Sequence, residues 1–310
     1  MEENWGMIGH QKIVQFLDKS IKVNRLAHAY LFYGQGSLGK TTLAEKFAET
    51  LLKTPEAVVT DLYKVGPLEG KKNIAIEQVR EWRLKLQMKS LHQGYKVGII
   101  YEAEKLNLES ANALLKTIEE PTPQTVIILI TSAWDKILPT IISRSQLIRF
   151  SPVINQEIIN CLSVREFPAA EIEKMVNFVG GYPGKIIAYL ESPELFTEFQ
   201  KLNKEVIKIF NSNLAERFLT IDKFLSSAKE FNKKVILTYE FLKHFRIIFR
   251  DMLLKNYNLP NLLQNKSLKI EKNYSVNELL TIGLKMEEAE NQLKSNVQPR
   301  LILENLMLHI

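Results

Sequence analysis

The stretch GQGSLGKT, Gly34–Thr41, has residue types and a spacing that suit phosphate binding. It fits the pattern G-x-x-x-x-G-K-S/T at every specified position, between a predicted strand and a predicted helix. Glycines let backbone N–H groups turn inward around an anion, and the following helix N-terminus adds partial positive charge. Lys40 can reach the β- and γ-phosphates of ATP or ADP, and the Thr41 hydroxyl can bind Mg²⁺. The expected cradle comprises Gly34, Gln35, Gly36, Ser37, Leu38, Gly39, Lys40, Thr41 and Thr42.

A second stretch, KVGIIYEAEKL (96–106), reads as a buried strand that ends in acidic residues. A P-loop ATPase generally carries an Asp at the end of such a strand to hold magnesium. That position is Tyr101, and a neutral phenol is a poor magnesium ligand at neutral pH. Glu102 stands where a carboxylate can act as general base on the attacking water. Glu104 is an alternative carboxylate, although we expect it on the helix after the strand. Three interpretations stay open: a working ATPase, an inactive one, and an ordinary strand-to-helix junction with surface acids.

The elements that would position these residues alternate between strands and helices. Apolar runs predict strands at 28–34, 96–100, 125–132 and 145–152. Helical periodicity predicts helices at 11–24, 40–52, 74–88 and 109–120. The connection over 53–73 reads as a polar loop, with Lys64, Lys71 and Lys72 as solvated charge. This alternation predicts a parallel α/β sheet covered by helices on both faces.

Strand signals fade from about residue 155 onward. Two helices are predicted within 155–181, a third opens at Pro183, and long amphipathic helices follow from about residue 200, with the main connection near Pro260. The chain is therefore expected to have an α/β domain over 1–152, a small helical domain over 153–200 and a helical domain over 201–310.

The composition is that of an ordinary globular protein, with 45% hydrophobic and 25% charged residues in 310. No apolar run approaches the roughly 20 residues that span a bilayer, and the acidic N-terminus lacks a signal-peptide core, so we expect a cytoplasmic protein without a membrane partner. Cys161 is the only cysteine, which excludes an internal disulfide and a cysteine-based zinc module.

The net charge of +6 is unevenly distributed along the chain. Residues 1–200 hold 23 Lys/Arg and 23 Asp/Glu, whereas residues 201–310 hold 18 and 12. A basic excess is typical of a chain with a polyanionic partner, and an ordinary solvated helical surface explains it equally well.

Several motifs together resemble bacterial DNA polymerase III clamp-loader subunits of the AAA+ class, most of all the delta-prime type. The opening segment GMIGHQKIVQFLDKSIKVNRLAHAYLFYG (6–34) is similar to the segment that flanks the nucleotide in this family. ANALLKTIEEPTPQTVIILITS (111–132) resembles its long helix and sensor strand, and LPTIISRSQLIRF (138–150) its Ser-Arg-Cys segment. GGYPGKIIAYLE (180–191) resembles the lid segment, and SNVQPRLILENLMLHI (295–310) the final collar helix. The resemblance spans nearly the whole chain, with the motifs in the family's order.

The resemblance implies a RecA-like P-loop domain, a small helical lid and a helical collar that joins subunits. It also implies a DNA-replication role, in which a pentamer with motor (gamma/tau-like) and clamp-opening (delta-like) subunits places a sliding clamp on primer–template DNA. Arg144 would act as a finger on the neighbouring subunit's nucleotide, which accelerates hydrolysis roughly 10³–10⁵-fold where it has been measured. Read without the family, Arg144 is an ordinary surface salt bridge.

The chain departs from the family pattern at several positions. Tyr101 replaces the magnesium Asp, and Lys185 stands where relatives that hydrolyse ATP carry the lid arginine, keeping the charge without the bidentate fork. Ser132 is at the position that senses the γ-phosphate, with Thr131 beside it. Ser145 replaces the cysteine after the finger arginine. The family's four-cysteine zinc module is absent, so no zinc site is expected.

These departures favour a rigid delta-prime-type subunit of the polymerase holoenzyme that donates Arg144, binds nucleotide and turns over slowly or not at all. Glu102 would then be a vestigial or weak general base. The first alternative is an ATP-hydrolysing motor subunit of the same loader. The second is another AAA+ ATPase, such as a branch-migration helicase, which would need a C-terminal winged-helix domain that the pattern over 201–310 disfavours.

Overall fold

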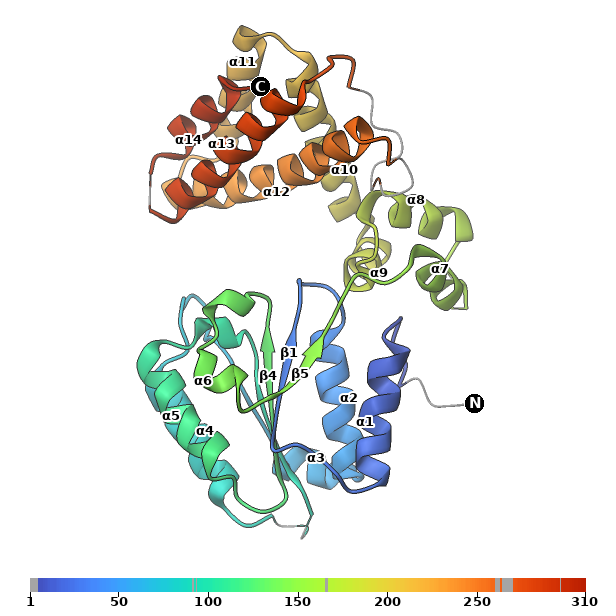
Figure 1. Cartoon of the computed structure of the whole chain (residues 1–310), viewed down its shortest axis with the longest axis vertical. Coiled ribbons are helices and arrows are strands. Elements are labelled where there is room, and N and C mark those ends of the chain that lie inside the picture. The colour runs from blue at the N-terminus through green and yellow to red at the C-terminus, as the bar shows by residue number, and fades with distance from the viewer. Residues whose placement is uncertain are drawn as a thin grey trace. The chain divides into compact units, whose positions relative to one another are not determined.

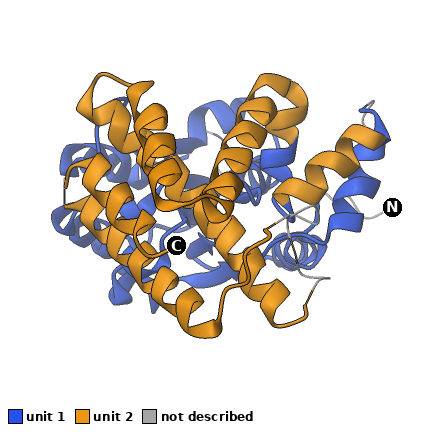
Figure 2. Cartoon of the chain, turned by 90° about the horizontal axis from the view of Figure 1, so that it is seen from above, with its two compact units in different colours: residues 1–169, 180–186 blue, residues 170–179, 187–310 orange. Residues whose placement is uncertain are grey.

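The computed structural model of the chain (Figure 1) describes residues 5–90, 92, 94–164, 167–259, 263, 270–295 and 297–310. The chain divides into two compact units, which are coloured separately in Figure 2. Unit 1 comprises residues 1–169 and 180–186, and unit 2 comprises residues 170–179 and 187–310.

Unit 1 is the α/β domain that the alternation of strands and helices predicted. Its elements in chain order are α1 (Gln11–Lys22), β1 (Ala29–Tyr33), α2 (Lys40–Leu52), α3 (Pro55–Asp61), β2 (Leu62–Val65), α4 (Ile76–Gln87), β3 (Lys96–Ile100), the 3-10 turn η1 (Ala103–Lys105), α5 (Leu108–Glu119), β4 (Thr125–Thr131), the 3-10 turn η2 (Trp134–Lys136), α6 (Pro139–Ile142), β5 (Gln146–Arg149) and α7 (Asn155–Ser163). Helix α9 (Pro183–Glu191) begins in unit 1 and ends in unit 2.

The five strands form one parallel sheet in the order β2-β3-β4-β1-β5. Alternate side chains of β1 enter different cores: Tyr30 and Phe32 pack with α1 and α2, and Leu31 packs in the core on the opposite face. Figure 1 shows α1 and α2 on one side of the sheet and α4 and α5 on the other. Burial on both faces explains the unbroken apolar runs of β1, β3 and β4. The predicted parallel sheet with helices on both faces is confirmed.

The prediction of a polar loop over 53–73 is wrong, because this stretch contains α3 and the edge strand β2. Helix α3 begins at Pro55, and the Thr54 side chain accepts a hydrogen bond from the Ala57 N–H at 3.2 Å. Lys64, predicted to be solvated loop charge, lies in β2 and forms a 2.7 Å ion pair with Glu45 of α2. Lys71 and Lys72, in contrast, are exposed and outside any helix or strand.

Unit 2 consists of helices, and its main apolar core is built from side chains between residues 202 and 310. Its elements are α8 (Ala169–Val179, counted from residue 170), the end of α9, α10 (Pro193–Asn211), α11 (Leu214–Ser226), α12 (Phe231–Asn256), α13 (Val276–Lys294) and α14 (Pro299–Met307). The buried Arg217 donates to the carbonyls of Ile209 and Met307, at 3.1 and 3.2 Å, and so satisfies the carboxyl ends of α10 and α14. The connection predicted near Pro260 lies largely outside the described residues.

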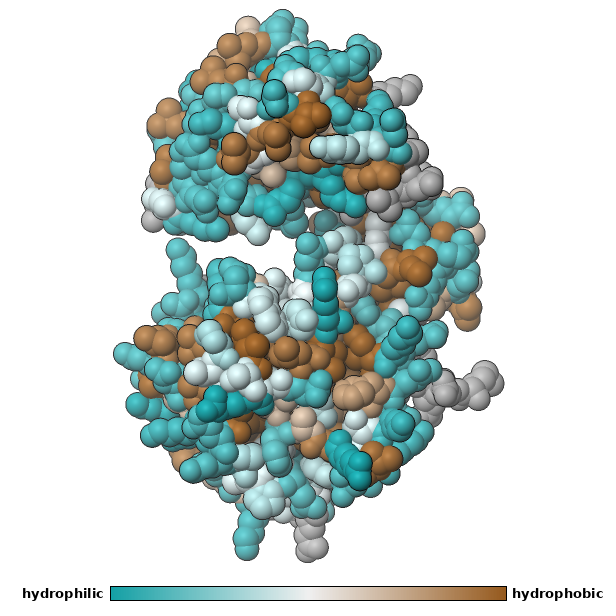
Figure 3. Space-filling model, viewed as in Figure 1, coloured by the Kyte–Doolittle hydropathy of each residue, from teal (hydrophilic) through white to brown (hydrophobic). Residues whose placement is uncertain are grey.

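Large apolar side chains remain exposed on the helices of unit 2. Figure 3 shows hydrophobic patches among hydrophilic residues on the visible face of this unit. The exposed apolar residues on α11, α13 and α14 include Leu219, Leu280, Leu284 and Leu301. None of the helices in the described residues has the length and apolar character needed to cross a bilayer.

Candidate nucleotide-binding site

The predicted site residues meet at the carboxyl edge of the sheet. Because the strands are parallel, β1 leads into the phosphate loop, β3 into the acidic stretch and β4 into Ser132 at this common edge. Loops at the carboxyl ends of parallel strands are the usual place for ligand sites in open α/β sheets. The fold therefore brings together residues that are about a hundred positions apart in the chain.

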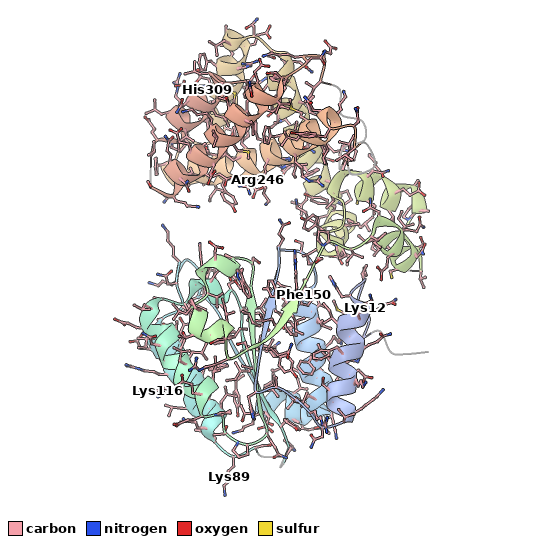
Figure 4. The ribbon with its side chains drawn as sticks, viewed as in Figure 1. Lys12, Lys89, Lys116, Phe150, Arg246 and His309 are labelled. Carbon is pink, nitrogen blue, oxygen red and sulfur yellow. The ribbon has the colours of Figure 1, made fainter. Side chains whose placement is uncertain are left out.

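The phosphate loop has the backbone that its sequence motif requires. Gly34, Ser37 and Gly39 have φ values of 142°, 61° and 87°, in the left-handed region that favours glycine. A Cβ at Gly34 would lie 2.4 Å from the carbonyl oxygen of Phe150, which follows β5 and is labelled in Figure 4. Helix α2 begins directly at Lys40, so its N-terminal N–H groups face the loop. Local geometry thus fits the predicted anion cradle.

Lys40 is buried and turned back onto its own loop. Its Nζ donates to the carbonyl oxygens of Gly34 and Gln35, each at 2.6 Å, and to the Ser132 hydroxyl at 3.3 Å. Burial lowers the Lys40 pKa to about 8, and the nearby Glu104 carboxylate opposes this shift. These carbonyls are weaker partners for an ammonium group than a phosphate is. A bound phosphate would therefore displace them and raise the pKa.

The two hydroxyls at the end of β4 point in different directions. Ser132 lies against Lys40, and its N–H donates to Glu104 Oε1 at 3.2 Å. Thr131 is buried, and its hydroxyl accepts a hydrogen bond from the Ala133 N–H at 3.1 Å. Of the two predicted candidates, only Ser132 therefore contacts the phosphate-loop lysine.

Tyr101 is hydrogen-bonded to helix α2. Its hydroxyl donates to Glu45 Oε1 of α2 at 2.7 Å, and the same carboxylate is paired with Lys64. Burial and the neighbouring Glu45 carboxylate raise the pKa of the Tyr101 phenol. The phenol is therefore neutral at neutral pH and occupied by a structural hydrogen bond.

The two glutamates after Tyr101 have different surroundings. Glu102 has a φ of 49°, is exposed, and forms a 2.7 Å ion pair with Lys105. Glu104 lies in η1 and turns back toward the end of β4, where Oε1 accepts the Ser132 N–H. Its Oε2 is buried and has no hydrogen-bond partner among the described residues. The acid that faces the loop is therefore Glu104, whereas the motif predicted Glu102 as the general base and gave Glu104 only as an alternative carboxylate.

The lid segment of unit 1 is bonded to the phosphate loop. The Tyr182 hydroxyl donates to Gln35 Oε1, and the Gly184 N–H donates to the Ser37 carbonyl at 3.0 Å. A Cβ at Gly184 would lie 3.1 Å from that carbonyl oxygen, so a larger residue would crowd this contact. Lys185 is half-buried in the first turn of α9, next to these contacts. The pairing of Tyr182 with Gln35 was not predicted, because neither residue belongs to a specified motif position.

A cavity of about 340 Å³ opens beside the first turn of the phosphate loop. Gly34, Gln35, Ser132, Arg149 and Tyr182 are among the residues that line it. The cavity thus has one basic side chain and several hydrogen-bonding groups next to the loop backbone. These groups suit a polar, anionic ligand.

Arg144 lies on the surface after α6. Its Nη2 is 3.0 Å from Glu119 Oε1, and Nη1 donates to the Thr140 carbonyl at 3.3 Å. The side chain is 43% exposed, which leaves it accessible to another molecule. Its partners belong to α5 and α6 and are not part of the phosphate loop.

The site fits a nucleotide phosphate better than it fits a metal ion alone. Thr41 and Thr42 are exposed at the start of α2, and the Thr41 hydroxyl is the group that the motif predicts to bind a phosphate-bound magnesium. Across the described ranges, no group of three or more His, Cys, Asp or Glu residues is arranged to hold a metal. Magnesium would therefore depend on phosphate oxygens and on few protein ligands.

Comparison with known proteins agrees with the motif-based resemblance. Residues 9–154 match the family model described as "DNA polymerase III, delta subunit". The DNA polymerase III subunit delta′ of Bacillus subtilis is 26% identical, with 96% of this chain and 94% of that protein covered. The corresponding subunit of Pseudomonas aeruginosa is 37% identical over 135 residues, which are 38% of this chain and 41% of that protein.

Proteins with other subunit names match as well. Curated relatives named tau and gamma subunits of DNA polymerase III align over about half of this chain, and less than half of either relative is covered. A crystal structure of a gamma subunit-related protein of Thermotoga maritima superposes with a TM-score of 0.57 at 18% identity, covering 94% of this chain and 98% of that one. This structural similarity concerns the fold.

Proposed function

We propose that this chain is a clamp-loader subunit of DNA polymerase III, of the delta-prime type that helps to load the sliding clamp onto primed DNA. In this role it binds ATP or ADP, hydrolyses ATP slowly or not at all, and acts on a neighbouring subunit. The near full-length similarity to the Bacillus subtilis subunit supports the delta-prime assignment.

One observation carries the proposed loss of hydrolysis. The phosphate loop and Lys40 have binding geometry, whereas the Tyr101 hydroxyl is bonded to Glu45 and Glu102 is paired with Lys105. Hydrolysis needs a carboxylate on the magnesium ion and a general base near the γ-phosphate. Binding can therefore persist where turnover is lost.

The exposed Arg144 supports action on a neighbour. An arginine on the protein surface can reach a γ-phosphate held by another subunit, where it stabilises the charge of the transition state. Its ion pair with Glu119 is exposed, and such pairs contribute only about 0–1 kcal/mol to stability. Arg144 can therefore leave Glu119 at little cost.

The other subunits of the loader are the proposed partners of this chain. The exposed leucines on the helices of unit 2 suit contacts with gamma/tau-like and delta-like subunits, and the basic excess over 201–310 suits an assembly on primer–template DNA. Ser132 and Lys185 would contact the γ-phosphate, as their positions beside Lys40 and in α9 suggest. A cytoplasmic location and domain boundaries at residues 152 and 200 belong to the same proposal.

Nucleotide binding and single-turnover hydrolysis on the isolated chain test this function. We expect ATP and ADP to bind, and [γ-³²P]ATP to remain largely uncleaved over minutes in a single-turnover experiment. The opposite result would be turnover at about 1 s⁻¹, a typical catalytic rate. If Glu102→Gln abolished this turnover, the chain would be a working ATPase.

A motor subunit of the same loader is the second candidate, because relatives named gamma and tau match the same domain. It would hydrolyse ATP in the presence of magnesium, and the clamp and primed DNA would stimulate it. The single-turnover experiment separates the two roles, and a reconstituted loader tests the action of Arg144 in trans. Arg144→Ala in a delta-prime-type subunit should lower loader ATPase by about 10³–10⁵-fold at the neighbouring site, whereas Glu119→Ala, which removes only the surface partner, should leave it unchanged. An unaltered loader with Arg144→Ala would disprove the action in trans.

A further inference from the structure

The Glu104 carboxylate is only half satisfied in this structure. Oε1 accepts the Ser132 N–H at 3.2 Å, while Oε2 is buried without a hydrogen-bond partner among the described residues. A buried carboxylate oxygen without a donor is costly, and such groups are usually explained by a water or an ion. Glu104 therefore has one carboxylate oxygen that no donor in the described part of the chain satisfies.

The Glu104 side chain lies next to the phosphate loop. Ser132, which holds Oε1, has its hydroxyl 3.3 Å from Lys40 Nζ. The Glu104 carboxylate also acts electrostatically on Lys40, the residue expected to contact the β- and γ-phosphates. An ion at Oε2 would consequently be near the phosphates of a bound nucleotide.

The other side chains of the acidic stretch are engaged elsewhere. The Tyr101 hydroxyl donates to Glu45, and the exposed Glu102 is paired with Lys105. The left-handed conformation of Glu102 reverses the chain after β3, so that η1 carries Glu104 back toward β4. Within this stretch, Glu104 is the carboxylate that faces the phosphate loop.

We propose that Glu104 is the carboxylate ligand of the divalent cation that accompanies the bound nucleotide, directly or through a cation-bound water. Magnesium commonly binds through one or two carboxylates together with substrate phosphates and waters, which is the donor set that Glu104, Thr41 and a nucleotide provide. Glu104 thereby takes over the role for which Tyr101 is unsuited. This inference rests on the nucleotide binding in the proposed function.

Equilibrium binding of ADP to the intact chain tests the inference without any catalytic readout. Affinity is measured with a fluorescent ADP in EDTA and in Mg²⁺, and Mn²⁺ binding to the protein–ADP complex is followed by electron paramagnetic resonance. Glu104→Gln keeps an oxygen for the Ser132 N–H. It should lower the affinity for the cation by about 10- to 100-fold, the range for groups that support a metal site. Its ADP affinity in EDTA should be unchanged or higher, because a negative charge near the phosphates has been removed.

Glu109→Gln is the matched control, since Glu109 is an exposed acid in the first turn of α5. It should retain the wild-type effect of Mg²⁺. The inference is overturned if Glu104→Gln binds Mn²⁺ like the wild type, or if it loses ADP affinity equally in EDTA and in Mg²⁺, which would indicate a structural role. Absence of ADP binding to the wild-type chain would overturn the proposed nucleotide binding as well, so the two failures are distinguishable.

Discussion

The phosphate loop and the end of β3 lie at the same edge of the sheet, but their polar side chains are engaged in different ways. In the loop, Lys40 is held by two backbone carbonyls and a serine hydroxyl, all of which a phosphate can replace. At the end of β3, Tyr101 and Glu102 bond to Glu45 and Lys105, side chains that belong to the protein framework and its surface. The loop is thus prepared for a ligand, whereas most of the acidic stretch is committed to the fold.

This difference shows how binding and hydrolysis can be separated within one P-loop fold. Binding depends on local backbone geometry and one lysine, which a short motif encodes. Hydrolysis also needs carboxylates delivered from other strands to the right points around the phosphates. A change at one of those points, such as the pairing of Glu102 with Lys105, can remove turnover without altering the cradle.

The largest loss of nucleotide affinity is expected from replacing Lys40. Lys40→Ala should weaken ATP and ADP binding by about 10- to 100-fold, since hydrogen bonds to charged groups are worth about 1.5–3 kcal/mol. Isothermal titration calorimetry measures the change. Lys46→Ala, on the same helix and paired with Glu49 at the surface, is the control and should bind like the wild type. Equal affinity of Lys40→Ala and wild type would mean that the loop is not the nucleotide site.

The pH dependence of nucleotide binding should also reveal Lys40. Burial lowers its pKa to about 8, and a bound phosphate, which favours the charged ammonium, should raise it. Below pH 8 the lysine is already protonated and affinity should be constant. Above that pH a proton must be taken up on binding, so affinity should fall by up to about tenfold per pH unit.

Titrations between pH 7 and 10 in two buffers of different ionisation enthalpy measure both the affinity and the proton uptake. Lys40→Met removes the titrating group without adding a charge, and its residual binding should lose this pH dependence. A wild-type affinity that stays flat from pH 8 to 10 would contradict the assignment of the shifted group.

The sequence predicted the loop well because its signals are local. Motif spacing, the apolar strand before it and the helical pattern after it all lie within about twenty residues, and α2 spans Lys40–Leu52 as expected. The edge strand β2 was missed because Leu62–Val65 is short and is defined as a strand by its pairing with β3. Helix α3 begins at Thr54-Pro55, a local helix-start signal within a stretch whose other residues predict a polar loop.

The end of β3 was less predictable because its contacts are distant in sequence. The Tyr101–Glu45 hydrogen bond joins residues 56 positions apart, and the Glu104–Ser132 bond joins residues 28 apart. The sequence indicated that Tyr101 is a poor magnesium ligand, yet it did not show where the phenol would go. The direction of Glu104 depends on the left-handed backbone at Glu102, a conformation that glutamate rarely signals.

A smaller effect is expected from the tyrosine hydroxyl at the end of β3. Tyr101→Phe removes its bond to Glu45 and should lower the free energy of unfolding by about 0.5–1.5 kcal/mol, while Glu45 keeps Lys64 as a partner. Urea unfolding measures the loss, and nucleotide affinity should not change. Tyr95→Phe removes an exposed hydroxyl bond to Asn24 and should cost less. Weaker nucleotide binding by Tyr101→Phe would show that this end of β3 is part of the binding site after all.

The smallest effect concerns the contact between the lid segment and the phosphate loop. Tyr182→Phe removes the hydroxyl bond that joins the lid segment to Gln35 of the phosphate loop. The rate of nucleotide association should rise by about 2- to 10-fold, the range of one hydrogen bond, and stopped-flow fluorescence with a labelled ADP measures it.

Because the bond needs both partners, Gln35→Ala should give a similar increase, and the two changes together should add little to either alone. Independent, multiplicative effects would mean that each side chain slows entry by itself. In that case the bond between them would not limit nucleotide entry. The rate of nucleotide association would then depend on Lys40 and its carbonyl partners alone.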